Sequence, residues 1–418
     1  MPAAYSSTRT PSQARRGGAG RAAPRIAGVD AARGLALVGM FSVHAYGAFA
    51  ADGSPTPAWM FAGGRSAATF ALLAGVGLAF TTGGRRPVVD RGTRAAIATR
   101  ALLVGLAGLL LGLASRTAGL DVDVILVFYA LLFLCALPLL RLHPRTLIGL
   151  ALLLAVAGPV LVHLLRDVLP MPSYDGDPTP ADLFTDPLGL LSDLLVHGNY
   201  PVLAWTAYVC AGLAAGRLDL RSRRVAGRLL AGGLALAAGT WLAATLLLRW
   251  FGGLWHLWRA EFTDTPWPEA RNEVLWDAPD GATWWSLISR APHSTSPFDM
   301  LHTLGSAAAL LGAVLLLTRH APGRTALAPL AAAGSMPLTL YCAHVLFLAT
   351  GALEDSPDLL CAALVAGALL FAMCWRRTAG RGPLEALVAA AAGRARRAAL
   401  GRDATSLSPT EPDKPQSA

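Results

Sequence analysis

The sequence is poor in charged residues and nearly devoid of lysine. Only 15% of its 418 residues are charged, whereas about 25% is usual in a soluble domain. Lys414 is the only lysine, so arginine supplies almost all of the positive charge behind the formal net charge of +9. Because these arginines stand between hydrophobic runs, we interpret them as a membrane-topology signal and expect no nucleic-acid partner.

Signatures of soluble enzymes and of metal sites are also missing. The sequence has no Walker motif, no Rossmann fingerprint and no His-Glu-x-x-His motif. Its five cysteines form no Cys-x-x-Cys pair, and all of them fall inside apolar runs. We therefore interpret the cysteines as small buried hydrophobic residues, and we expect neither a disulfide framework nor a bound metal.

Hydrophobic runs, in contrast, recur from one end of the chain to the other. Hydrophobic residues make up 54% of the sequence, and the mean hydropathy is +0.49. These runs predict an all-α fold, a polytopic membrane helix bundle of about ten transmembrane helices. The ten predicted spans are residues 34–50, 66–82, 95–115, 123–140, 145–165, 201–216, 227–248, 298–318, 330–351 and 358–375.

The connections between these spans alternate in charge, which predicts the topology. Arginine clusters precede the first span and follow the second, fourth, sixth, eighth and tenth, while the other connections are acidic or poor in arginine. Since positive loops remain in the cytoplasm, both termini are predicted to be cytoplasmic. Arg116, Arg166 and Arg249 lie on the opposite side, as exceptions to the pattern.

The same pattern divides the chain into three parts. Residues 1–25 are predicted to be a disordered, basic cytoplasmic tail, residues 26–380 the membrane domain, and residues 381–418 a second cytoplasmic tail, first amphipathic along the inner surface and then disordered. Two outer loops, 166–200 and 249–297, are long, and long ordered loops usually have a function. The second holds seven of the eleven tryptophans, which could stack on sugars or form an interfacial belt.

The first span carries two ionisable residues, Arg33 and His44, eleven positions apart. At about 100° and 1.5 Å per residue, their side chains return to within about 20° of one face, about 16 Å apart along the axis. Ionisable groups are costly inside a membrane, so both are functional candidates. Alternatively, His44 could bond to a neighbouring helix, Arg33 could reach the inner surface, and Asp30 could cap the helix and pair with Arg33.

The predicted topology places further polar candidates in the outer half of the membrane. Arg65 and Ser66 begin the second span, His302 lies near the start of the eighth, and His344 lies in the outer third of the ninth. Asp299 and His302 could form a catalytic pair or simply the interfacial start of a helix. Four other histidines lie in loops or at span edges and carry little signal: His143, His256, His293 and His320.

The residues around the first span resemble those of two related groups of membrane acyltransferases. Arg33 and His44, preceded by Asp30, resemble the signature of bacterial enzymes that acylate surface polysaccharides. Over about residues 25–375 the layout is similar to the heparan-alpha-glucosaminide N-acetyltransferase family and its bacterial relatives. The matching segments run from Arg25 to Gly34, Gly64 to Gly77, Tyr200 to Trp205 and Gly334 to Tyr341.

The resemblance implies a multi-pass acyltransferase in the bacterial inner membrane. Acyl-CoA, most simply acetyl-CoA, would enter from the cytoplasm, and a glycan or other cell-envelope acceptor would take the acyl group outside. By this resemblance, Arg33 and Asp30 would bind the acyl donor and His44 would be the base. Arg33 and His44 should then line one cavity. Four residues would support the reaction on the acceptor side: Arg65, Ser66, His302 and His344. The oligomeric state is left open, with a homodimer among the options.

Elementary chemistry is compatible with these roles. A neutral histidine in a dry site can take a proton from a hydroxyl or amine that attacks a thioester. The guanidinium of Arg33 suits phosphate, which it can bind through two hydrogen bonds. Ser66 or Thr69 could stabilise the thioester oxyanion.

The sequence departs from the heparan enzymes at the histidine. Those enzymes have an asparagine where His44 stands, and their working histidine lies in the loop just beyond the first span. Here that loop reads Pro55-Thr56-Pro57-Ala58-Trp59 and has no histidine. Either His44 takes over the role or the activity is lost or altered. The alternatives are a non-catalytic transporter or permease for a small polar solute, and a structural membrane subunit.

Overall fold

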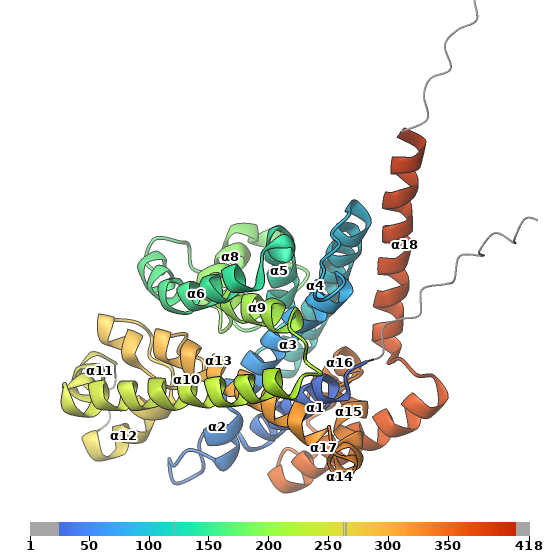
Figure 1. Ribbon diagram of the computed structural model, residues 1–418. Coiled ribbons are helices and arrows are strands. Elements are labelled where there is room, and N and C mark those ends of the chain that lie inside the picture. The colour runs from blue at the N-terminus through green and yellow to red at the C-terminus, as the bar shows by residue number, and fades with distance from the viewer. Residues whose placement is uncertain (1–24, 121, 262, 264–265, 407–418) are drawn as a thin grey trace, which may run out of the picture.

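The computed structural model describes residues 25–406 except 121, 262, 264 and 265, and over these residues it is built from helices and loops (Figure 1). The predicted disordered tails therefore lie largely outside the described residues. The helices are α1 (Ala27–Tyr46), α2 (Pro57–Ala62), α3 (Arg65–Thr81), α4 (Arg91–Ala118), α5 (Leu126–Ala136), α6 (Pro144–Leu165), α7 (Asp182–Thr185), α8 (Pro187–Ser192), α9 (Val202–Gly216), α10 (Arg223–Trp250), α11 (Gly253–Glu261), α12 (Trp267–Trp276), α13 (Pro297–Leu317), α14 (Ala321–Ala326), α15 (Ala328–Ala333), α16 (Pro337–Leu348), α17 (Pro357–Thr378) and α18 (Pro383–Ser406). Short 3-10 or π-helical segments are η1 (Pro138–Arg141), η2 (Asp193–His197) and η3 (Trp284–Ile288).

Each of the ten predicted spans coincides with one or more of these helices. Among the described residues, six helical stretches are long and apolar enough to cross a membrane: Pro57–Thr81, Arg91–Ala118, Pro144–Leu165, Arg223–Trp250, Pro297–Leu317 and Pro357–Thr378. The other four predicted spans correspond to α1, to the shorter helices α5 and α9, and to the pair α15 and α16. The prediction of an all-α, polytopic membrane helix bundle is confirmed.

Helix α1 lies inside the bundle rather than at its surface. It packs against α3, α13, α15, α16 and α17, and in Figure 1 it runs among these helices. It begins at Ala27, seven residues before the predicted span, because its first turns are buried by protein rather than by lipid. A helix surrounded by other helices can carry polar groups that lipid would exclude, which explains how Asp30, Arg33 and His44 fit on one helix.

The ninth predicted span is two helices rather than one. Helix α15 ends at Ala333, residues 334–336 are not helical, and Pro337 begins α16. The break lies against α1, where Gly34 meets Leu330 and Gly334 meets Asp30 so closely that a methyl group at either glycine would overlap backbone atoms. These two glycines let the broken segment cross α1, and they place Ser335 and the start of α16 beside Arg33.

The segment predicted to lie along the inner surface is the long helix α18, which runs beside α4 (Figure 1). Glu385 in its first turn accepts hydrogen bonds from the backbone N–H groups of Leu338 and Thr339, at 2.7 and 3.1 Å. The same carboxylate accepts a hydrogen bond from the Thr339 hydroxyl at 2.6 Å. Glu385 therefore caps the N-terminus of α16 and ties this helix to the bundle.

The tryptophan-rich loop folds into a cap formed by α11, α12 and η3. It encloses a small apolar cluster of its own with the end of α10: Leu248, Leu257, Val274 and Leu275. The rings of Trp255 and Trp258 lie 4.9 Å apart between centroids, and those of Trp258 and Trp267 lie 6.0 Å apart. These three side chains pack against one another, which favours a structural role for them over sugar stacking.

Candidate active site

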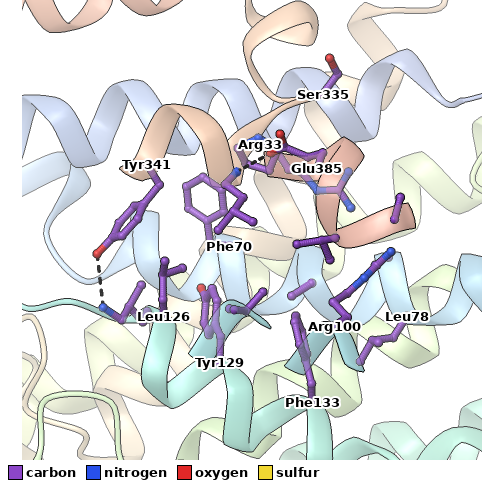
Figure 2. A pocket seen from close by; sticks show the side chains of 18 of the residues that line it. Arg33, Phe70, Leu78, Arg100, Leu126, Tyr129, Phe133, Ser335, Tyr341 and Glu385 are labelled. Carbon is purple, nitrogen blue, oxygen red and sulfur yellow. Dashed lines mark hydrogen bonds between the residues drawn. The ribbon is translucent and has the colours of Figure 1, made fainter. Parts of the chain in front are cut away.

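A cavity of about 420 Å³, which we call the inner cavity, lies between α1, α3, α4, α5, α16 and α18. It is found at the arginine-rich end of the bundle, the cytoplasmic end in the predicted topology. Its charged lining residues are Arg25, Arg33, Arg100, Arg381 and Glu385. Its walls are largely apolar or aromatic, and Figure 2 shows Phe70, Tyr129 and Phe133 among them.

Arg33 enters the inner cavity from α1. Its Nη1 donates to Oδ1 of Asp30 at 3.1 Å, and its Nη2 donates to the carbonyl oxygen of Leu73 at 3.0 Å. Asp30 is buried and forms the ion pair considered from the sequence, but it does not cap α1, whose N-cap is Ile26. A guanidinium has five N–H donors, so these two bonds fix its plane and leave donors for a ligand.

The arginines of the inner cavity are not neutralised by its one glutamate. Both carboxylate oxygens of Glu385 already accept hydrogen bonds from the start of α16. Four arginines against Glu385 and the Asp30 that pairs with Arg33 leave a formal charge of +2 at this cavity. A cavity of this size and charge fits a small-molecule ligand with several negative groups.

A second, much smaller cavity of about 30 Å³, which we call the outer chamber, lies beyond the inner cavity. Its polar lining residues are His44, Ser66, Asp123, Tyr200, His293 and Tyr341. By volume it has room for about two water molecules. Among the described residues that line it, and with histidine taken as neutral, the one formal charge is that of Asp123.

The two cavities have three lining residues in common: Met40, Ile125 and Tyr341. The hydroxyl oxygen of Tyr341 accepts a hydrogen bond from the backbone N–H of Ile125 at 3.3 Å, drawn as the dashed line in Figure 2. Met40 lies between Arg33 and His44 on the same face of α1, at helical spacings of seven and four residues. Arg33 and His44 do not line one cavity as expected: Arg33 lines the inner cavity, His44 lines the outer chamber, and Met40, Ile125 and Tyr341 line both.

His44 is joined directly to His344 across α1 and α16. Nδ1 of His44 lies 3.0 Å from Nε2 of His344, and Nδ1 of His344 lies 2.6 Å from the carbonyl oxygen of Tyr341. Since a carbonyl only accepts, the neutral His344 carries its hydrogen on Nδ1, and its Nε2 accepts the N–H of His44. This assignment leaves the lone pair of the neutral His44 on Nε2, where it can act as a base.

Arg65 and His302, two other candidates from the sequence, bind each other instead of lining the outer chamber. Nη2 of Arg65 donates to Nε2 of His302 at 3.0 Å, and Nδ1 of His302 donates to the carbonyl oxygen of Ala237 at 3.0 Å. Both ring nitrogens of His302 are thus occupied, and neither is left for Asp299. Ser66, next to Arg65, does line the chamber.

Two protein families match this chain, one over each part of it. The family described as heparan-alpha-glucosaminide N-acetyltransferase, catalytic, matches residues 25–257, which is more than half of the chain. The chain belongs to this family. A second family, described as a protein of unknown function (DUF418), matches residues 278–394. No curated protein matches the chain.

The outer chamber is assembled from both matched regions. The heparan-alpha-glucosaminide N-acetyltransferase region supplies His44, Ser66 and Asp123, whereas the second region supplies His293 and Tyr341. The inner cavity is divided in the same way, with Arg33 and Arg100 from the first region and Arg381 from the second. Both cavities therefore need both parts of the chain.

His293 is a chamber residue that sequence reasoning missed. Its ring stacks on that of Trp59, with centroids 5.8 Å apart. Trp59 belongs to the segment after the first span, which has no histidine of its own in this chain. Burial lowers the pKa of His293, and the negative charge of Asp123 acts in the opposite direction. The usable signal in the sequence was the polar run that contains His293 just before the eighth span, combined with the missing loop histidine.

Proposed function

We propose that this multi-pass membrane protein moves an acyl group, most simply acetyl, from cytoplasmic acyl-CoA to a glycan or other cell-envelope acceptor outside the bacterial inner membrane. The observation that carries the proposal is the meeting of the two cavities at Met40, Ile125 and Tyr341. A large cationic cavity lies on one side of this boundary, and a small chamber with a histidine base lies on the other. Membership of the acetyltransferase family supports the same reaction class.

The inner cavity suits the donor. Coenzyme A carries phosphate groups at one end, and guanidinium groups bind phosphate through charge-assisted hydrogen bonds. Arg33, Arg100 and Arg381 would hold these phosphates. The apolar walls would take the thioester arm, whose acyl carbon would then reach the boundary at Tyr341. The cavity volume of about 420 Å³ lies within the usual range for small-molecule sites.

The outer chamber suits the transfer step. A hydroxyl or amine of the acceptor would attack the thioester carbonyl carbon while Nε2 of His44 takes its proton. The tetrahedral intermediate would then break its C–S bond, and the leaving thiolate would take that proton from His44. His344 would stabilise the positive ring of His44 by accepting its Nδ1–H. The hydroxyls of Ser66 and Tyr341 line the chamber and could donate to the oxyanion.

The test compares the wild-type chain with a His44→Gln variant, which keeps a polar side chain but removes the base. We expect acetyl-CoA-dependent acylation of the cell envelope to fall at least about 100-fold, the usual effect of losing a general base. Acetyl-CoA binding to the purified chain should remain within about threefold, since His44 does not line the inner cavity. Unchanged acylation at equal protein levels would defeat the proposal.

A second candidate function is that of a transporter or permease for a small polar solute. The break between α15 and α16 favours it, because broken helices at membrane depth often line substrate sites. A transporter would move solute across vesicle membranes without releasing CoA from acetyl-CoA. Release of CoA that depends on His44 would therefore exclude this alternative for the site.

A further inference from the structure

A short loop, residues 289–296, contributes to the outer chamber just before α13. The loop is polar but largely buried, with Ser289 and Ser296 each only 1% exposed. His293 and Thr295 adopt positive φ angles of 63° and 48°. Residues other than glycine take up this left-handed region when the surrounding structure imposes it, and such strained positions cluster at functional sites.

The same loop contains buried polar atoms that lack a partner. Within the described part of the chain, Nε of Arg290, Nδ1 of His293 and Oγ of Ser294 are buried and have no hydrogen-bond partner. Buried polar atoms in proteins are nearly always hydrogen-bonded, so each exception calls for an explanation. Of these three residues His293 lines the outer chamber, so its Nδ1 is the atom that a ligand in the chamber could bind.

His293 connects this loop to the reaction centre. It lines the outer chamber together with His44 and Asp123. Trp59 stacks on its ring, and Tyr200 meets the ring edge-on with centroids 5.5 Å apart. The two aromatic contacts fix the plane of the imidazole, while its free Nδ1 can still form a hydrogen bond.

We propose that His293 and Asp123 form the acceptor subsite of the outer chamber and bind the hydroxyl- or amine-bearing end of a sugar. An imidazole and a carboxylate can together accept and donate hydrogen bonds to such a group. The chamber, at about 30 Å³, admits the reactive group and excludes the sugar ring, which stays outside. His293 orients the attacking group, and His44 remains the base, so this subsite rests on the proposed function for the chemical step.

The experiment uses the purified full-length chain in lipid nanodiscs, with D-glucosamine and D-glucose as probe acceptors. CoA release is measured at saturating acetyl-CoA while each sugar is varied. We expect His293→Ala to raise the KM for the accepted sugar about tenfold, the effect of losing one hydrogen bond. The KM for acetyl-CoA should stay within about twofold, and His293→Gln should restore part of the loss.

A matched control is His256→Ala. Like His293, His256 stacks on a tryptophan ring: its partner is Trp285 in η3, with centroids 4.5 Å apart. His256 does not line the chamber. We expect this variant to keep both KM values. Asp123→Asn should raise the KM for D-glucosamine more than that for D-glucose if the accepted group is a charged amine.

Binding of the sugars is measured separately by saturation-transfer NMR, so that the two proposals can fail independently. Sugar signals that disappear in His293→Ala uphold the subsite, even if no variant releases CoA and the proposed function fails. Absence of signals from both sugars with the wild-type chain would overturn the subsite. An acceptor KM that His293→Ala leaves within twofold of wild type would overturn it while leaving acyl transfer intact.

Discussion

The inner cavity and the outer chamber adjoin each other but differ in size and charge. The inner cavity measures about 420 Å³ and has a formal charge of +2 from four arginines, one glutamate and the Asp30 that pairs with Arg33. The outer chamber measures about 30 Å³, and its described lining residues carry one formal charge, that of Asp123. A large anionic ligand fits only the first, and only a small reactive group fits the second. This difference supports the proposal that donor and acceptor approach the boundary from opposite ends.

The largest expected effect comes from blocking the boundary. Met40→Trp places an indole between the two cavities, where Met40 now lines both. We expect acyl transfer to fall at least about 100-fold while acetyl-CoA still binds within about threefold, because the phosphate-binding arginines are untouched. CoA release and equilibrium binding of acetyl-CoA measure the two effects.

The matched control is Leu35→Trp, which adds the same side chain to α1 at a position that is 36% exposed. This variant should retain wild-type transfer. If Met40→Trp transfers acyl groups normally, then donor and acceptor do not meet at this boundary, and the two cavities do not hold the two substrates of one reaction.

A smaller effect is expected from the charge of the inner cavity. Arg100→Ala removes one guanidinium from its lining and should raise the KM for acetyl-CoA about tenfold, with little change in kcat. Arg94→Ala, on the same helix α4 but exposed and outside the cavity, should have no effect.

A donor that has no phosphate groups sharpens this prediction. With acetyl-pantetheine as the donor, wild type and Arg100→Ala should give the same KM. An equal rise in KM for both donors would show that Arg100 acts on the fold of the cavity rather than on phosphate.

An effect of similar size, on kcat instead of KM, is expected at His344, which contacts His44 but does not line the outer chamber. His344→Phe removes the acceptor for the Nδ1–H of His44. As a positioning residue it should lower kcat about tenfold, shift the pH profile of kcat and leave both KM values unchanged. A changed acceptor KM with normal kcat would instead assign His344 to acceptor binding.

The smallest effect on activity is expected at His302. It binds Arg65 and Ala237 away from both cavities, so His302→Gln should leave transfer within about threefold. Loss of one buried hydrogen bond should lower the melting temperature of a chain of this length by about 1–2 °C. A 100-fold loss of transfer in a variant that melts normally would place His302 in the reaction and contradict the geometry.

The helices and part of the site could be predicted from the sequence, because each depends on a local pattern. Hydrophobic runs predicted the bundle, and the spacing of Arg33 and His44 predicted that both side chains share one face of the first helix. The charge of the connections placed His44 and His344 at a similar depth, and in the structure their rings are hydrogen-bonded.

Other parts of the site depend on packing between distant segments, which a single sequence does not reveal. Arg381 is indistinguishable in the sequence from the arginines that only set topology, and Arg100, although inside the predicted span 95–115, carries no local sign that it shares a cavity with Arg33. Tyr341 reaches the boundary because the ninth span breaks and α16 starts beside α1. His293 belongs to a long loop, and its position against Trp59 depends on how the cap of α11, α12 and η3 folds.

The central claim is that an acyl donor in the inner cavity presents its acyl carbon to His44 across the boundary. The most direct test is an experimental structure of the full chain with an acetyl-CoA analogue in which a methylene group replaces the thioester sulfur. We predict phosphate groups at Arg33 and Arg100 and the acetyl carbonyl beside Tyr341, facing Nε2 of His44. An analogue bound outside the inner cavity, or with its acetyl end directed away from His44, would contradict the account.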